Sequence, residues 1–361
     1  MMTYKEALFF VGKCLTITHE SHNRKIVERE IKSGNVDWDT IVKVSTAHYV
    51  FPALYCNLKR ANLLSYLPEE LASYMKYITD LNRRRNLQII EQAKEVNELL
   101  LANNITPIFL KGTAFLIEGL FEDIAERMVG DIDFLVTKES YKTTINILKK
   151  EGYNTKEKEE HIIFPSIHYP KMTKKNSFTA IEIHSKVILS RYYNSYNYSF
   201  FIKKNRLFGN FTIPSVKTQI LHNCINKQFG DNGRYYNLIS LRNSYDLHLL
   251  SIKENTLEII QPHKLFFKSF NKYIAISKFI LNSNLLSFEK NKAVSIHQKA
   301  IIFFLNHPSL QKTKILFINF LMKNKNRAIT IFKSIYKKSY RDYLIYKFSI
   351  LYLTSSKSNP P

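Results

Sequence analysis

The chain has 361 residues, of which 45% are hydrophobic, so a disordered protein is excluded and roughly two or three domains are expected. Lys and Arg outnumber Asp and Glu by 53 to 30, which gives a formal net charge of +23. This charge favours a polyanionic partner: a nucleotide, RNA or an anionic membrane surface. Lysines that only solvate helices would give the same excess.

Cys14, Cys56 and Cys224 are far apart and odd in number, so they predict no disulfide framework and fit a reducing compartment. The first residues lack the pattern of a signal peptide, and no stretch has the roughly 18 uncharged apolar residues of a membrane-spanning helix. We therefore expect a cytoplasmic protein, which its basic tail could also hold at the periphery of a membrane.

Residues 1–103 are expected to form a helical region. Its last apolar residues recur at helical spacing with charged residues between them. These residues are Leu87, Ile89, Ile90, Ala93, Val96, Leu99 and Leu100. Pro52 and Pro68 would separate the earlier helices.

Residues 104–214 differ, because short apolar runs bounded by Gly, Asp, Asn and Pro replace the helical spacing. Four such runs are predicted to be strands, at 107–110, 132–136, 162–164 and 181–187. Helices are expected between the first two strands, over about 113–120, and after the second, over about 138–150. This order predicts a small mixed α/β unit.

Residues 215–361 return to helical spacing, with apolar stripes over 216–225 and 238–250. Beyond about residue 287 the tail alternates apolar residues with Lys and Arg. The whole chain is therefore predicted to be α+β, with a small mixed-sheet core between an N-terminal helical region and a basic, helical C-terminal region.

The strongest local signal is the segment Asp131-Ile132-Asp133. Side chains alternate along a strand, so both aspartates would point to one face and Ile132 to the other. Two neighbouring carboxylates repel each other unless a cation lies between them, and Mg²⁺ prefers oxygen ligands. A solvent-facing pair on a half-exposed strand is the alternative, and is the more common case for such a motif alone.

A third carboxylate occurs in the run 180–184, where Glu182 and His184 share one face of a predicted strand. If this strand lies beside the one that carries Asp131 and Asp133, three carboxylates converge, which is what a two-metal site requires. His184 could position a substrate, or it could simply bond to a neighbouring element.

Upstream, Lys111-Gly112-Thr113 follows an apolar run and begins a predicted helix, where backbone N–H groups could bind phosphate. The Thr113 hydroxyl could cap the helix or contact phosphate, and Lys111 could pair with an anion. Arg127 could hold phosphate oxygens, or could pair with a neighbouring acid. An ordinary strand-to-helix turn remains the alternative for the tripeptide.

Together these motifs resemble the DNA polymerase β-like nucleotidyltransferase superfamily, and most closely its broad uncharacterised bacterial family. The matching elements are Leu110-Lys111-Gly112, Arg127, Asp131-Ile132-Asp133-Phe134-Leu135-Val136 and Glu182-Ile183-His184. The resemblance spans about 45–265. The superfamily's usual Gly-Ser is here Gly112-Thr113, which leaves the detail of triphosphate binding open.

The resemblance implies transfer of a nucleoside monophosphate from a nucleoside triphosphate to an acceptor hydroxyl, with loss of pyrophosphate. The acceptor could be a small molecule, a glycan precursor, a protein or RNA. Asp131, Asp133 and Glu182 would hold two Mg²⁺ ions, or Mn²⁺, with Glu182 also a candidate base. The phosphates would be bound by Lys111, Gly112, Thr113 and Arg127, and His184 would contact the acceptor.

Two other functions remain open. A two-metal phosphohydrolase could use similar carboxylates. A non-catalytic module on a transferase-like core could bind RNA or a membrane surface through the basic tail. Among the remaining polar residues, His161 and His168 are expected in a loop or at a sheet edge, although a hairpin could bring them to the site. His222 is expected off the apolar face of its helix, where it could face the cleft, and Asp246 in a structural pair such as one with Arg242.

Overall fold

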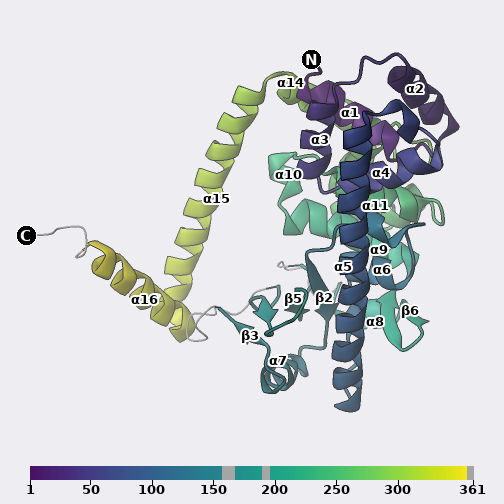
Figure 1. Cartoon of the computed structure of the whole chain (residues 1–361). Helices are drawn as coiled ribbons and strands as arrows, with labels where there is room; N and C mark the ends of the chain where they lie inside the picture. The colour runs from purple at the N-terminus through teal and green to yellow at the C-terminus, as the bar shows by residue number, and fades with distance from the viewer. Residues whose placement is uncertain (157–166, 189–195, 356–361) are drawn as a thin grey trace, which may run out of the picture.

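The computed structural model describes residues 1–156, 167–188 and 196–355. Its seven strands all lie between residues 108 and 214, and helices precede and follow them (Figure 1). The α+β class predicted from the sequence is confirmed. None of the helices in the described ranges combines the length and the apolar composition needed to cross a membrane.

The strands form one mixed sheet in the order β3-β4-β5-β2-β1-β7-β6. The pairs β2–β5 and β1–β7 are parallel, and the other neighbours are antiparallel. Their bounds are β1 Ile108–Phe109, β2 Asp131–Leu135, β3 Asn154–Thr155, β4 Met172–Thr173, β5 Ala180–His184, β6 Asn205–Phe208 and β7 Phe211–Pro214.

Helices pack around this sheet from both ends of the chain. Those before β2 are α1 Tyr4–Cys14, α2 Ser21–Lys32, α3 Trp38–Ala47, α4 Phe51–Arg60, the 3₁₀-helix η1 Leu64–Tyr66, α5 Glu69–Ala102, α6 Lys111–Ile117 and the 3₁₀-helix η2 Ile124–Glu126. Those after it are α7 Tyr141–Lys150, α8 Tyr198–Ile202, α9 Val216–Ile225, the π-helix η5 Asn226–Gly230, α10 Gly233–Tyr236, α11 Leu241–Ser251, α12 Thr256–Ile260, α13 Lys264–Leu281, α14 Lys292–Asn306, α15 Pro308–Tyr336 and α16 Lys338–Ser355.

Helix α5 is 34 residues long and runs along the body of the molecule beside the sheet (Figure 1). It begins directly after Pro68, with Glu69 and Glu70 in the first turn, where carboxylates stabilise the positive end of the helix. Its first half packs with helices from both ends of the chain, and its second half packs with the sheet. The same helix therefore contacts both apolar clusters and fixes the sheet against the helical body.

Several predicted bounds need correction. The helix expected over 113–120 spans Lys111–Ile117, and the one expected over 238–250 begins only at Leu241. Two short strands, β3 and β4, precede β5, and the hairpin β6–β7 was not predicted. The strand predicted at 162–164 lies outside the described residues.

Candidate active site

Strands β2 and β5 lie side by side and parallel, with Asp133 opposite Glu182 and Leu135 opposite His184. This is the adjacency on which the three-carboxylate hypothesis depends. Ile132 and Phe134 are fully buried on the other face, so the polar side chains must share the opposite one. The alternation of side chains therefore gathers the acidic groups at one place.

Asp133 is the centre of the cluster and is almost completely buried, at 3% exposure. Its Oδ1 atom lies 2.5 Å from Lys111 Nζ and 2.8 Å from His184 Nε2. His184 Nε2 also lies 3.6 Å from Glu182 Oε2. The Lys111 ammonium and the His184 imidazole thus converge on one buried carboxylate, which makes its charge tolerable in the interior.

Asp131 lies nearer the surface and has a different partner. Lys171 Nζ is 2.7 Å from Asp131 Oδ2 and 3.3 Å from Glu182 Oε1, so this lysine bridges the two strands. Lys171 directly precedes β4, a segment that the sequence did not associate with the site. Its side chain is 56% exposed, so it can leave without breaking a packed contact.

The surroundings shift the pKa values of these groups in opposite directions. Burial alone would raise the pKa of Asp133, but Lys111 and His184 outweigh it and hold the pKa well below its usual range. Burial would lower the pKa of His184, yet its bonds to Asp133 and Glu182 raise it. For Asp131, burial and repulsion from Asp133 outweigh Lys171 and raise the pKa. The buried Asp133 is therefore ionised more readily than Asp131, which lies nearer the surface.

Lys111 is the first residue of α6 and has an unusual backbone conformation. Lys111 itself has φ +51°, in the left-handed region, and this directs its ammonium group to Asp133. Gly112 is required for packing, because a Cβ atom there would lie 2.9 Å from Val129 Cγ2. The buried Thr113 donates its hydroxyl to the Asp131 carbonyl at 3.3 Å and so supports β2.

Arg127 is buried and forms an ion pair with Asp246, which lies 119 positions later in the chain. Its Nε donates to Asp246 Oδ1 at 2.9 Å and its Nη1 to the Met128 carbonyl at 2.8 Å. The pairings considered from the sequence, Arg127 with a neighbouring acid and Asp246 with Arg242, are thus replaced by one between the two buried residues. From α5, Asn86 Nδ2 donates to the Arg127 carbonyl at 2.8 Å and fixes the loop.

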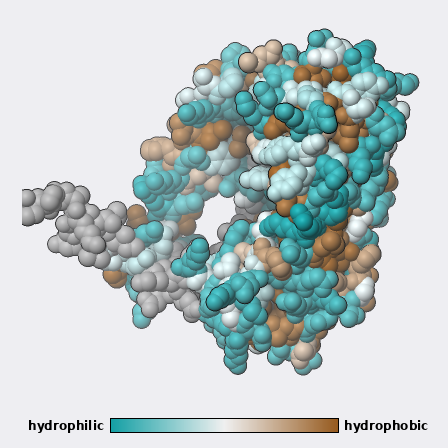
Figure 2. Space-filling view, viewed as in Figure 1, coloured by the Kyte–Doolittle hydropathy of each residue, from teal (hydrophilic) through white to brown (hydrophobic). Residues whose placement is uncertain are grey.

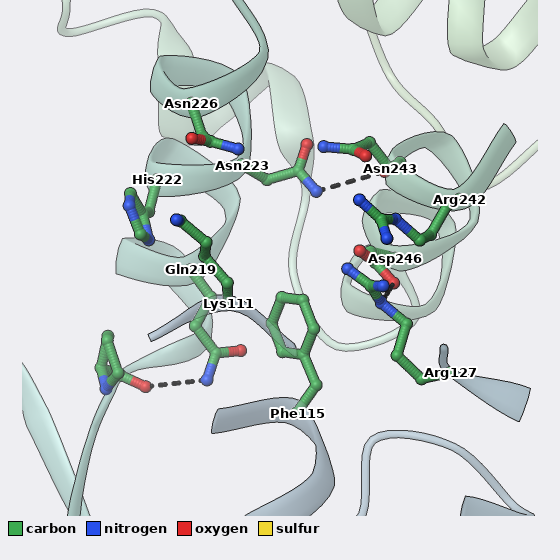
Figure 3. Close-up of a pocket in the computed structure, with 11 residues that line it drawn as sticks. Lys111, Phe115, Arg127, Gln219, His222, Asn223, Asn226, Arg242, Asn243 and Asp246 are labelled. Atoms are coloured by element: carbon green, nitrogen blue, oxygen red, sulfur yellow. Dashed lines mark hydrogen bonds and ion pairs between the residues drawn. The ribbon is translucent and has the colours of Figure 1, made fainter. Parts of the chain in front are cut away.

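Two adjoining cavities open beside these residues. One, of about 210 Å³, is lined by Asp131, Asp133, Lys111, Arg127 and Arg242 among others. The second, of about 60 Å³, extends between α9 and α11 and is shown in Figure 3. Lys111, Arg127 and Arg242 line both, so cationic groups border the space that begins at the carboxylates.

The second, smaller cavity is lined mostly by polar side chains. Gln219, His222, Asn223 and Asn226 face it from the α9 side, and Arg242 from α11 (Figure 3). Gln219 Nε2 donates to the Pro214 carbonyl at 3.1 Å, but its buried Oε1 has no hydrogen-bond partner in the described part of the chain. Burial and the nearby Lys111 lower the pKa of His222 to about 3, so its ring is neutral. The cavity can therefore both accept and donate hydrogen bonds.

Among the other polar residues weighed from the sequence, His168 forms an isolated β-bridge with His184 at the end of β5. Its ring centroid lies 5.3 Å from that of His184, so it borders the site. His161 lies outside the described residues. Lys171 and Arg242 were missed, because an exposed lysine and a helical arginine carry no local signal in so basic a chain.

The donor set fits a divalent metal ion. Asp133, Glu182 and His184 each offer one ligand atom, and these atoms all lie within 4.8 Å of one another. Two carboxylates and one imidazole are ligands for Mn²⁺ or Zn²⁺, and the carboxylates also suit Mg²⁺. His184 Nδ1 is buried without a partner among the described residues, so only Nε2 is engaged in the cluster.

A family model described as uncharacterised nucleotidyltransferase matches residues 34–259. The match covers more than half of the chain and includes every residue of the cluster and of both cavities. The chain belongs to this family. The predicted resemblance is thereby confirmed, and membership of a nucleotidyltransferase family supports nucleotidyl transfer as the general activity.

The other comparisons add little. No curated protein matches the chain. A crystal structure of JHP933 from Helicobacter pylori covers 71% of this nucleotidyltransferase-family chain and 99% of its own, at 13% identity and a TM-score of 0.28. A similarity this low says nothing about the chemistry of the site.

Proposed function

We propose that the protein transfers a nucleoside monophosphate from a nucleoside triphosphate to an acceptor hydroxyl, with Mg²⁺ or Mn²⁺. The observation that carries this proposal is the register of β2 and β5, which sets Asp133 against Glu182 beside a cavity with a cationic border. The acceptor would be a small molecule, a glycan precursor, a protein or RNA.

The carboxylates would hold the metal ions. Asp131, Asp133 and Glu182 would be the ligands of two ions, with His184 either a further ligand or a donor that orients Asp133. Lys111 and Lys171 would have to release these carboxylates first. Divalent ions bound there would neutralise the triphosphate and polarise the bond that breaks.

The chain's own cations would bind the phosphates. Lys111, once released from Asp133, would reach the triphosphate together with Arg127, and Gly112 leaves its backbone open to the same cavity. Thr113 would act through the strand that it supports. Arg242, which lines both cavities, joins this group.

Glu182 would take the proton of the acceptor hydroxyl. The bond from His184 lowers its pKa against the effect of burial, so it is a carboxylate at neutral pH and can accept a proton. The acceptor oxygen would attack the α-phosphorus, the bond to the bridging oxygen would break and pyrophosphate would leave. His184 borders the place where the acceptor would lie.

The test is incubation with labelled nucleoside triphosphates, Mg²⁺ or Mn²⁺ and a cell extract as the source of acceptor. We expect labelled acceptor and pyrophosphate, and a loss of at least about 100-fold in Asp133→Ala, because the metal ligand and its charge are removed together. Glu139→Ala, an exposed carboxylate beside the sheet, is the matched control.

Other outcomes would overturn the proposal. Pyrophosphate release that persists in both Asp131→Ala and Asp133→Ala would place the chemistry elsewhere. Phosphate release without labelled acceptor would indicate a two-metal phosphohydrolase instead. Thermal unfolding of each variant shows whether a loss of activity comes from a loss of folding.

A further inference from the structure

Helix α15, which we call the arm, lies between α14 and α16 and extends away from the helical body. It is 29 residues long and contains no buried residue. Figures 1 and 2 show it leaving the helical body after α14, with an open gap beside its C-terminal half. Its N-terminal half contacts the body, where Tyr236 Oη donates to Asn319 Oδ1 at 2.6 Å and Lys314 Nζ lies 4.4 Å from the centroid of the Phe304 ring.

The arm carries an apolar stripe that faces water. Leu310, Phe317, Leu321, Phe332 and Ile335 follow one another at intervals of seven, four, eleven and three residues, which brings them to one side of a helix. Each of these five side chains is at least 49% exposed. Exposed apolar side chains that recur on one side of a helix mark a site that something else covers.

The arm and the residues on either side of it are strongly basic. Residues 290–341 contain twelve Lys or Arg residues and no Asp or Glu. Within the arm itself the cations are Lys312, Lys314, Lys323, Lys325, Arg327 and Lys333. Such a segment attracts a surface that is both anionic and apolar.

We propose that the arm binds along the surface of a lipid bilayer that contains anionic lipid. The apolar stripe would lie at the boundary between headgroups and acyl chains, and the lysines would reach outward to the lipid phosphates. Six cations are too costly to place in hydrocarbon, so the helix axis lies in the plane of the surface.

Charge and shape favour this occupant over two others. A second copy of the chain would set one arm with six cations and no acid against another like it. A nucleic acid would match the cations but leave the stripe of aromatic and aliphatic side chains uncovered. An anionic bilayer satisfies both features at once.

The test is co-sedimentation of the full chain with vesicles of phosphatidylglycerol and phosphatidylcholine, and with vesicles of phosphatidylcholine alone. We expect binding to the anionic vesicles that weakens as salt is added. Phe317→Ser/Phe332→Ser should weaken this binding at least about tenfold, because two large apolar side chains are lost. Leu87→Ser/Leu207→Ser, at exposed sites on α5 and β6, is the matched control and should bind as the parent does.

A charge variant tests the second half of the proposal. Lys323→Gln/Lys325→Gln should weaken binding to anionic vesicles, whereas the exposed pair Lys94→Gln/Lys142→Gln should not. Binding that is equal in the arm variants and their controls would overturn the proposal. So would binding of a single-stranded RNA without any binding of vesicles, or a dimer by sedimentation equilibrium that the serine variant abolishes.

Discussion

The central residue of the site is Asp133, a buried carboxylate whose charge is balanced by Lys111 and His184. A divalent ion and the Lys111 ammonium would compete for the same oxygen atoms, since both are attracted to the negative charge. Lys111 therefore stabilises the metal-free site and opposes the metal-bound one. These two effects can be separated by removing the ammonium group while keeping the length of the side chain.

We expect Lys111→Met to lower the free energy of unfolding by about 2 kcal/mol without metal, less than the roughly 3–5 for a fully buried pair, because His184 still contacts Asp133. Added Mn²⁺ should raise the melting temperature more in this variant than in the parent, since the competing cation is gone. Thermal unfolding with and without Mn²⁺ measures both effects.

Lys138→Met is the control, because Lys138 is exposed beside the sheet. Methionine has a Cβ atom like lysine, so the strain of the left-handed backbone at position 111 is unchanged. If Mn²⁺ stabilised the variant and the parent equally, Lys111 would not compete with the metal ion, and its role would be confined to phosphate binding or to folding.

Among the residues of the site, the sequence predicted the acidic side chains better than the basic ones. Side-chain alternation puts Asp131 and Asp133 on one face, and the same rule applies to Glu182 and His184. Side-chain alternation could not predict Lys171, because its contact with Asp131 depends on where the segment before β4 lies relative to β2. Long-range ion pairs of this kind leave no local pattern.

The elements of the site are joined by the ion pair between Arg127, in the loop before β2, and Asp246, in α11. Both side chains are almost completely buried, at 8% and 2% exposure. Burial raises the pKa of Asp246, and Arg127 only partly offsets this. The pair therefore fixes the sheet against the C-terminal helices at the edge of both cavities.

We expect Arg127→Met to destabilise the fold by about 3 kcal/mol, the low end for breaking a buried pair, because Asp246 loses its hydrogen-bonded partner and keeps only the nearby Arg242. Arg127→Met/Asp246→Asn should recover at least about 1 kcal/mol relative to the sum of the single changes, since the second change removes the unpaired charge. Urea unfolding of the parent, both single variants and the double variant gives the coupling energy.

The surface pair Lys76–Asp80, with side chains 65% and 37% exposed, serves as the reference. Lys76→Met should cost less than about 1 kcal/mol, because exposed pairs are well solvated and contribute little. Additive effects of the Arg127 and Asp246 changes would mean that the pair does not hold the two elements together.

Elements were predicted well where the apolar spacing was long and regular. The stripe over 216–225 became α9 with the same bounds, whereas the hairpin of β6 and β7 was missed. Its turn at Gly209, with φ +58°, is the type of signal that indicates a hairpin. The two-residue strands β3 and β4 are too short for any side-chain period to show.

At the scale of the whole molecule, helices from both ends of the chain pack together into one helical body. One apolar cluster contains Leu8 and Leu54 from the N-terminal helices together with Ile274 and Leu281 from α13. Helical spacing predicts each helix but not which distant helix it contacts, so this arrangement could not be read from the sequence. The division of the chain at residues 103 and 214 stays a prediction.

This helical body buries histidines as neutral rings. His248 is fully buried between α11 and its neighbours, with Nδ1 2.9 Å from Ser283 Oγ and Nε2 without a partner in the described residues. Burial lowers the pKa of His248 and of His222 to about 3, and that of His48 and of His297 to about 4. In the unfolded chain each imidazole would have its ordinary pKa of about 6.5.

The folded state therefore binds fewer protons than the unfolded state between the two pKa values. The contribution of these histidines to stability is fully present above about pH 6.5. It is lost as the pH falls toward about 4 for His48 and His297 and toward about 3 for His222 and His248, because protons then favour the unfolded chain. Each histidine adds a slope of up to about 1.4 kcal/mol per pH unit. We expect urea unfolding to show a free energy of unfolding that declines steadily over this acidic range.

The variant His248→Gln isolates one of these contributions. Glutamine does not titrate, so the slope over the acidic range should become shallower by up to about 1.4 kcal/mol per pH unit, whatever the change in stability at neutral pH. His307→Gln, at an exposed position, should leave the slope as it is in the parent. A slope that His248→Gln does not alter would mean that carboxylates and not this buried imidazole control unfolding in acid, since every other titrating group is common to the two proteins.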